Sequence, residues 1–199
     1  MPVQTKKENT EPTEANWESQ NYSKNKGIFF KIFFDFFSHK YFLKDMGDGF
    51  GTYIKIDNIS IKENNIFNIG DSFLAFSYKI YLNCDKNDKQ MNNHKLLFLK
   101  IYSGDTELEP IILGQDKQLY TIGRGKNADI TIKDKMLSRI NCFIYYDKGI
   151  WNIHDGNQSG ESSTNGTWLY AFEDIEIHDN MMFKSNKFNF CCKFSSIPK

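Results

Sequence analysis

The sequence has little proline, little cysteine and no net charge. Its 199 residues include 4 prolines and 4 cysteines, and 25 basic residues are balanced by 25 acidic ones. Proteins that bind nucleic acids or anionic membranes usually carry a basic excess, so the neutral balance argues against both partners. Any anion-binding site must therefore be local and built from a few side chains.

The cysteines and histidines lack the spacing of metal or disulfide sites. The cysteines show no CxxC spacing, and the histidines occur singly along the chain. Disulfide frameworks and zinc sites both need such patterns, so we expect no metal, no cofactor and reduced thiols. Reduced thiols predict a cytoplasmic protein, with the cytoskeleton, the cilium and the nucleus left open as alternatives. The cysteines are Cys84, Cys142, Cys191 and Cys192, and the histidines are His39, His94, His154 and His178.

Long hydrophobic runs are also missing. The most apolar stretch, residues 27–37, is interrupted by Lys31 and Asp35 and is far shorter than the ~20 residues of a membrane span. Residues 1–20 lack the apolar centre of a signal peptide. We therefore expect neither membrane insertion nor export, and we interpret residues 27–37 as a buried strand.

What remains is a pattern of short apolar runs separated by Gly, Asn and Asp, which predicts an all-β protein from residue 28 onward. Residues 1–26 are too polar to form a core and are interpreted as a tail. Residues 83–95 carry no apolar pattern and are predicted to be a linker. The linker would separate a β unit at residues 27–82 from a domain at residues 96–199.

These two units resemble each other. The first unit has no counterpart to residues 96–137, so we interpret residues 27–82 as an incomplete repeat that serves as a packing or partner surface. The similar segments are Tyr41–Asp45 with Trp151–Asp155, Gly51–Tyr53 with Gly166–Trp168 and, more weakly, Phe67 with Phe183.

Five short motifs follow one another in the second unit, and most of them mark the change from an apolar strand to a polar loop. They are Tyr-Thr-Ile-Gly-Arg at 120–124, Ala-Asp-Ile-Thr-Ile at 128–132, Met-Leu-Ser-Arg at 136–139, Trp-Asn-Ile-His-Asp at 151–155 and Ser-Thr-Asn-Gly-Thr at 163–167.

In these motifs the chain resembles the forkhead-associated (FHA) family over roughly residues 96–194. The resemblance implies an FHA-type β-sandwich of two antiparallel sheets whose loops bind phosphothreonine in partner proteins. It also implies that Arg124 and Ser138 grip the phosphate, that Arg139 and Thr164 add donors, and that Asn165 bonds the peptide backbone. Gly123 and Gly166 would then lie in tight turns.

The residue types agree with this implication. A phosphate monoester carries close to two negative charges and three strong acceptors, so a reader needs a guanidinium and several uncharged donors. Loops on a stiff β scaffold are suited to hold such a set. One position departs from the family pattern, because Asn141 stands where a histidine usually braces the loops. We expect a shorter and weaker brace there.

Enzyme motifs are not matched. Residues 123–128 fit G-x-G-x-x-A, but a strand pattern follows where a helix is needed. Residues 85–90 lack two features of a calcium loop, and Ser159 misses the G-x-S-x-G pattern by one place. We therefore expect a non-enzyme that acts as a phosphothreonine-dependent adaptor. The alternative is a structural subunit of a large assembly, ciliary or axonemal, that uses the sandwich without binding phosphate.

Overall fold

The computed structural model describes residues 27–82 and 93–195. Within these ranges the chain is all-β and has no helix. The strands are β1 (Phe30–Asp35), β2 (Lys40–Asp45), β3 (Thr52–Ile56), β4 (Asn58–Ser60), β5 (Ile66–Ile69), β6 (Ser72–Leu82), β7 (Asn93–Ser103), β8 (Thr106–Glu107), β9 (Ile111–Leu113), β10 (Leu119–Gly123), β11 (Ile130–Thr131), β12 (Cys142–Asp147), β13 (Ile150–Asp155), β14 (Thr167–Tyr170), β15 (Ile175–Glu176), β16 (Met182–Ser185) and β17 (Phe188–Cys191).

The strands form three hydrogen-bonded sheets. Their orders are β1-β2-β15, then β11-β10-β12-β13-β4, and then β17-β16-β3-β14-β5-β6-β7-β8, with β9 also paired to β7. All of these strand pairs are antiparallel except β10 with β11, which is parallel. The expected sandwich of antiparallel sheets is therefore confirmed in its class, with one parallel pair at a sheet edge.

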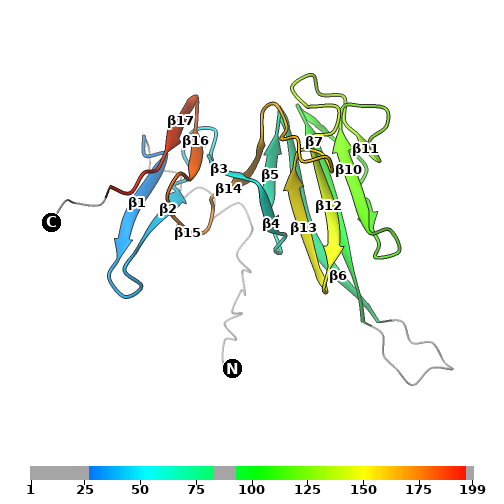
Figure 1. Cartoon of the computed structure of the whole chain (residues 1–199), viewed down its shortest axis with the longest axis horizontal. Coiled ribbons are helices and arrows are strands. Elements are labelled where there is room, and N and C mark those ends of the chain that lie inside the picture. The colour runs from blue at the N-terminus through cyan, green and yellow to red at the C-terminus, as the bar shows by residue number, and fades with distance from the viewer. Residues whose placement is uncertain (1–26, 83–92, 196–199) are drawn as a thin grey trace, which may run out of the picture.

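The strands gather into two groups in Figure 1. We call β4–β13 the closed lobe, because it contains both layers of a sandwich. We call β1, β2 and β15–β17 the open lobe, because its two layers end at β1 and β17 and no further described strand pairs with these two. The strands β3 and β14 lie between the lobes and pair with each other.

The two halves of the chain exchange strands. After β3, the chain passes into the closed lobe, where β4 pairs with β13 and β5 pairs with β14. After β14, the chain passes into the open lobe, where β15 pairs with β2 and β16 pairs with β3. Each lobe is thus completed by strands from the other half of the sequence.

The registers of the exchanged strands follow the internal repeat. Ile54 of β3 lies opposite Leu169 of β14, and these two residues hold the same position in the two repeats. Ile54 also pairs with Phe183, while Leu169 pairs with Phe67. The repeated segments are therefore related by an approximate two-fold axis through the β3–β14 pair.

This arrangement differs from the predicted division into units at 27–82 and 96–199. The segment between them is spanned by a hairpin, because β6 and β7 pair over eleven residues from Ser72–Ser103 to Leu82–Asn93. Residues 93–95 of the predicted linker belong to β7, and residues 83–92 and the predicted tail lie outside the described residues. The physical reason is that neither repeat can bury its apolar face alone, and the long β6–β7 ladder fixes them together.

The core lies inside the closed lobe, passes through β3 and β14, and continues into the open lobe with Leu43, Met181 and Phe183. Trp151 and Phe67 are its largest fully buried side chains, and they come from different halves of the sequence. Burial of such side chains contributes about 1.5–3 kcal/mol each relative to an exposed state. The core therefore rigidly supports the loops at the ends of β10, β12 and β13.

Candidate functional site

Three loops of the closed lobe meet at one cavity of about 540 Å³. The first follows β10, the second precedes β12, and the third joins β13 to β14. The lining residues are Arg124, Ser138, Arg139, Ile140, Asn157, Glu161, Ser162 and Thr164.

Arg124 is positioned by the backbone of the second loop. Its N–H donates to the Ser138 carbonyl at 3.1 Å, and its Nε donates to the Leu137 carbonyl at 2.6 Å. The preceding Gly123 allows this approach, because a Cβ there would lie 2.2 Å from the Arg139 carbonyl oxygen. Gly123 is thus needed for close packing of two backbones, which differs from the expected role in a tight turn. The Arg124 side chain also lines the cavity, and a guanidinium is a donor that is suited to an anion.

Ser138 and Thr164 join the second loop to the third. The Thr164 N–H donates to Ser138 Oγ at 2.9 Å, and Ser138 Oγ donates to Thr164 Oγ1 at 3.2 Å. Two hydroxyl groups are therefore held side by side on the cavity wall. Hydroxyl groups can rotate to donate to an incoming acceptor, as a phosphate oxygen would require.

Asn165 is anchored beside the cavity without lining it. Its side-chain Nδ2 donates to the Met136 carbonyl at 2.7 Å, and its backbone carbonyl accepts the Trp168 indole N–H at 2.7 Å. Gly166 follows with a φ of +78°, a left-handed conformation that favours glycine. The expected tight turn at Gly166 thus agrees with the backbone, and the Asn165 side chain is fixed at the surface.

Two buried polar residues hold these loops from below. Asp155 accepts hydrogen bonds from Ser163 Oγ at 2.6 Å, from the Ser163 N–H at 3.0 Å and from Thr167 Oγ1 at 2.7 Å. Asn141 is fully buried, and its Oδ1 accepts the Ser138 N–H at 3.2 Å while its Nδ2 donates to Thr167 Oγ1 at 3.4 Å. Asn141 therefore connects the second and third loops, the bracing place that was predicted for it.

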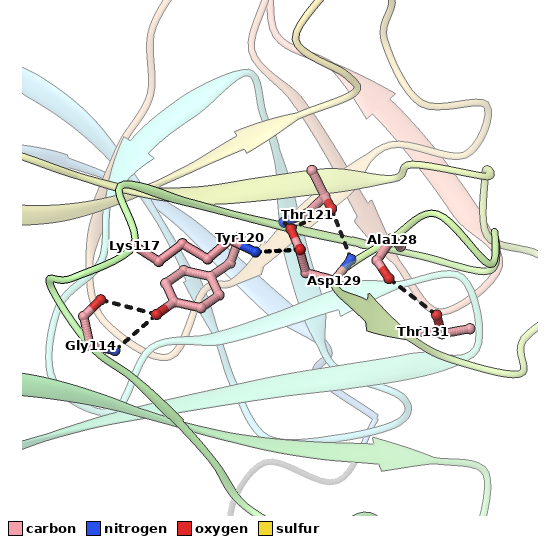
Figure 2. A network of polar contacts seen from close by, with 7 residues as sticks. All are labelled: Gly114, Lys117, Tyr120, Thr121, Ala128, Asp129 and Thr131. Carbon is pink, nitrogen blue, oxygen red and sulfur yellow. Dashed lines mark hydrogen bonds and ion pairs between the residues drawn. The ribbon is translucent and has the colours of Figure 1, made fainter.

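The first loop is closed by a side-chain clamp between β10 and β11 (Figure 2). Asp129 Oδ2 accepts the Thr121 N–H at 2.9 Å and Thr121 Oγ1 at 2.8 Å, and the Asp129 N–H donates to Thr121 Oγ1 at 2.9 Å. Lys117 also pairs with the Asp129 carboxylate. Lys117 and the Thr121 donors lower the pKa of Asp129 to about 2. The loop that carries Arg124 therefore begins and ends on fixed strands.

The structure brings four of the predicted ligand residues to one cavity, namely Arg124, Ser138, Arg139 and Thr164. Sequence reasoning missed three further polar lining residues: Asn157, Glu161 and Ser162. They lie in the third loop, between the motifs that end at Asp155 and begin at Ser163. That position was the available signal, because a loop joining two site motifs must pass the site.

A protein-family model for the FHA domain matches residues 120–184, which run from β10 to β16. This chain contains an FHA domain. No curated protein matches the chain significantly. FHA domains are interaction modules for protein partners, commonly ones that carry phosphothreonine. The FHA match includes all three loops of the cavity.

Residues 27–82 and 93–195 show neither a metal site nor a membrane-spanning helix. No group of three or more His, Cys, Asp or Glu side chains in these ranges is placed to hold a metal ion. The same ranges contain no helix that is long and apolar enough to cross a membrane. The burial of Cys142 raises the pKa of its thiol, which disfavours the reactive thiolate.

Proposed function

We propose that the chain binds phosphothreonine segments of a partner protein at the cavity between the three loops of its FHA domain. The observation that carries this proposal is the convergence of Arg124, Arg139, Ser138 and Thr164 on one cavity. Two guanidinium groups supply charge-assisted hydrogen bonds, and two hydroxyl groups supply neutral donors. This donor set complements the charge and the three oxygens of a phosphate monoester.

Asn165 would contact the peptide rather than the phosphate. Its amide nitrogen is committed to Met136, so the side chain is held in one orientation at the surface beside the cavity. An anchored amide oxygen can accept a backbone N–H of an extended peptide. The chain would in this way act as an adaptor that recruits a phosphorylated protein. The cytoplasmic location stays a prediction.

The test is titration of the full chain with a library of phosphothreonine peptides and their unphosphorylated forms, followed by fluorescence anisotropy. Arg124→Ala should weaken binding by about thirtyfold or more, because loss of a charged, hydrogen-bonded contact costs ~2–5 kcal/mol. Lys126→Ala is the matched control, since Lys126 is an exposed cation of the same loop that does not line the cavity. Equal binding of both peptide forms, or no effect of Arg124→Ala, would contradict the proposal.

A second function, a scaffold subunit in a larger assembly, is favoured by the exposed apolar side chains of the open lobe. Exposed apolar patches commonly mark interaction surfaces. The same titration separates the two functions, because a scaffold without a phosphate site would not discriminate phosphorylated peptides.

A further inference from the structure

The open lobe has fewer strands than the closed lobe, and apolar side chains on the inner faces of its sheets are exposed. In the closed lobe, β10 pairs with the edge of β12, and β7 pairs with the edge of β6. In the open lobe, β1 is the equivalent of β12, and β17 is the equivalent of β6. Both β1 and β17 are the last strands of their sheets among the described residues. Among the described residues, the outer edges of β1 and β17 therefore have no counterparts of β10 and β7 paired to them.

Matched positions in the two lobes show the consequence for apolar side chains. Ile32 lies opposite Leu43 in the open lobe, and Ile144 lies opposite Ile153 in the closed lobe. Leu43 and Ile153 hold the same position in the two repeats, so Ile32 and Ile144 are equivalent. Ile144 is 0% exposed, whereas Ile32 is 48% exposed. Leu74 of β6 is likewise 0% exposed, and its counterpart Phe190 of β17 is 36% exposed. The open lobe thus exposes side chains whose counterparts form a core.

The free edge of β1 has a defined hydrogen-bonding pattern. The Met46 N–H donates to the Phe29 carbonyl at 2.9 Å, and hydrogen-bonded pairs alternate along an antiparallel ladder. The backbone groups of Phe30, Ile32 and Phe34 therefore point away from β2 and toward the free edge. These three residues also share the inner face with Leu43, since directly paired residues point to the same side.

This edge is complementary to itself. In an antiparallel pairing of β1 with a second β1, centred on Phe33, Ile32 lies opposite Phe34 and their free backbone groups form hydrogen bonds. Lys31 then lies opposite Asp35 on the outer face, twice in the two-fold arrangement. The Asp35 carboxylate is already fixed in position, because it accepts hydrogen bonds from the Ser38 N–H at 3.0 Å and from the Ser38 hydroxyl at 2.6 Å. Opposite charges placed directly across strands stabilise the pair.

We propose that the chain forms a two-fold dimer in which β1 of one copy pairs antiparallel with β1 of a second copy about Phe33. The pairing joins the inner faces of two open lobes and covers Ile32 with Phe34 of the second copy. It is independent of phosphate binding, because the cavity lies in the closed lobe.

The first test is the mass of the full chain in solution, measured by sedimentation equilibrium over a wide concentration range. A dimer is expected, and Lys31→Asp should weaken it by about tenfold or more by placing like charges opposite each other. Asp35→Lys should do the same. Mixing these two variants should restore a dimer, because each copy then meets the opposite charge. A chain that stays monomeric throughout would overturn the proposal.

A cysteine at the axis tests the register. Two copies of Phe33→Cys, in a background with Cys84, Cys191 and Cys192 changed to Ser, would lie in a non-hydrogen-bonded pair about 4.5 Å apart, which suits a disulfide. A disulfide-linked dimer is expected under mild oxidation. The controls are Phe42→Cys, on the same face one strand inward, and Tyr145→Cys, the matched position in the closed lobe. Neither control should cross-link, and failure of the Phe33→Cys variant to cross-link in a dimeric sample would overturn the proposed pairing.

Discussion

Arg124 is held in its place before any ligand binds. Its backbone N–H and its Nε both donate to carbonyls of the loop before β12. A long side chain that is already fixed loses less conformational entropy on binding than a mobile one. Ser138 and Thr164 are likewise fixed by their mutual hydrogen bonds. The cavity therefore presents its donors in a nearly constant geometry.

Glu161 opposes the positive charge of the cavity that it lines. Glu161→Gln removes this negative charge and keeps an oxygen that can accept the Asn157 Nδ2–H, a bond of 2.7 Å in the native chain. We expect phosphothreonine peptides to bind about two- to fivefold more tightly, since a carboxylate repels a nearby phosphate dianion. Fluorescence anisotropy at low and high salt measures the effect, which should shrink as salt screens it.

The matched control for this change is Glu109→Gln. Glu109 is exposed in the loop between β8 and β9 and does not line the cavity. Its replacement should leave the affinity unchanged at both salt concentrations. Weaker binding of the Glu161→Gln variant would instead mean that Glu161 supports the loop or contacts the peptide directly.

At the scale of elements, the β10–β11 pair illustrates how a short strand is kept in register. β11 has only two residues, and its pairing with β10 is reinforced by the Asp129–Thr121 contacts. Tyr120, the residue of β10 before Thr121, is also fixed by its side chain, because its hydroxyl bonds both the N–H and the carbonyl of Gly114, each at 3.1 Å (Figure 2). The Asp129–Thr121 contacts thus add to the few backbone hydrogen bonds of β11, and the Tyr120–Gly114 contact fixes β10 itself.

Asp129→Asn should lower the free energy of unfolding at pH 7, and the difference from the parent chain should vanish in acid. The pKa of Asp129 is about 2 in the folded chain, below the ~3.9 of an unfolded aspartate. The charged carboxylate therefore contributes stability above about pH 4, and this contribution is lost as the pH falls through about 2. Urea unfolding followed by tryptophan fluorescence between pH 2 and pH 7 measures the difference.

Asp105→Asn provides the comparison, because Asp105 is an exposed carboxylate in the turn between β7 and β8. Its variant should track the parent chain at every pH. A constant gap between Asp129→Asn and the parent chain from pH 7 to pH 2 would mean that the clamp acts through its geometry and not through the Asp129 charge.

At the scale of the whole molecule, the convergence of the motif residues on one cavity could be predicted from the sequence, whereas the connectivity could not. The motifs that contain Arg124, Ser138 and Thr164 lie beside strand ends, and loops at one end of a sandwich meet in space. The exchange of strands could not be predicted in the same way. Phe67 and Phe183 are equivalent apolar residues of the two repeats, and either one fits beside Ile54 or Leu169. Local patterns therefore do not decide which copy completes which lobe.

The length of the β6–β7 hairpin decides which half of the sequence completes which lobe. β6 pairs with β7 over eleven residues, whereas β17, which holds the equivalent position in the open lobe, has four. If β16 and β17 folded back onto their own half of the sequence, much of the edge of β7 would stay unpaired. Long exposed edges are unfavourable because their backbone groups lose their partners. The exchanged arrangement is therefore favoured by the longer ladder.

Expression of the chain in two pieces tests this conclusion. Residues 93–199 contain the whole FHA match, yet in the structure the segment β4–β6 supplies part of their core. We expect this piece alone to unfold at a much lower urea concentration and to bind phosphothreonine peptides weakly. Co-expression with a tagged piece of residues 1–86 should give a copurifying complex with the affinity of the intact chain. Phe67→Asp in the tagged piece should prevent copurification, because it places a charge in the core of the closed lobe. If residues 93–199 alone matched the intact chain in stability and affinity, β15–β17 would be shown to close on their own half, and the exchange of strands would be wrong.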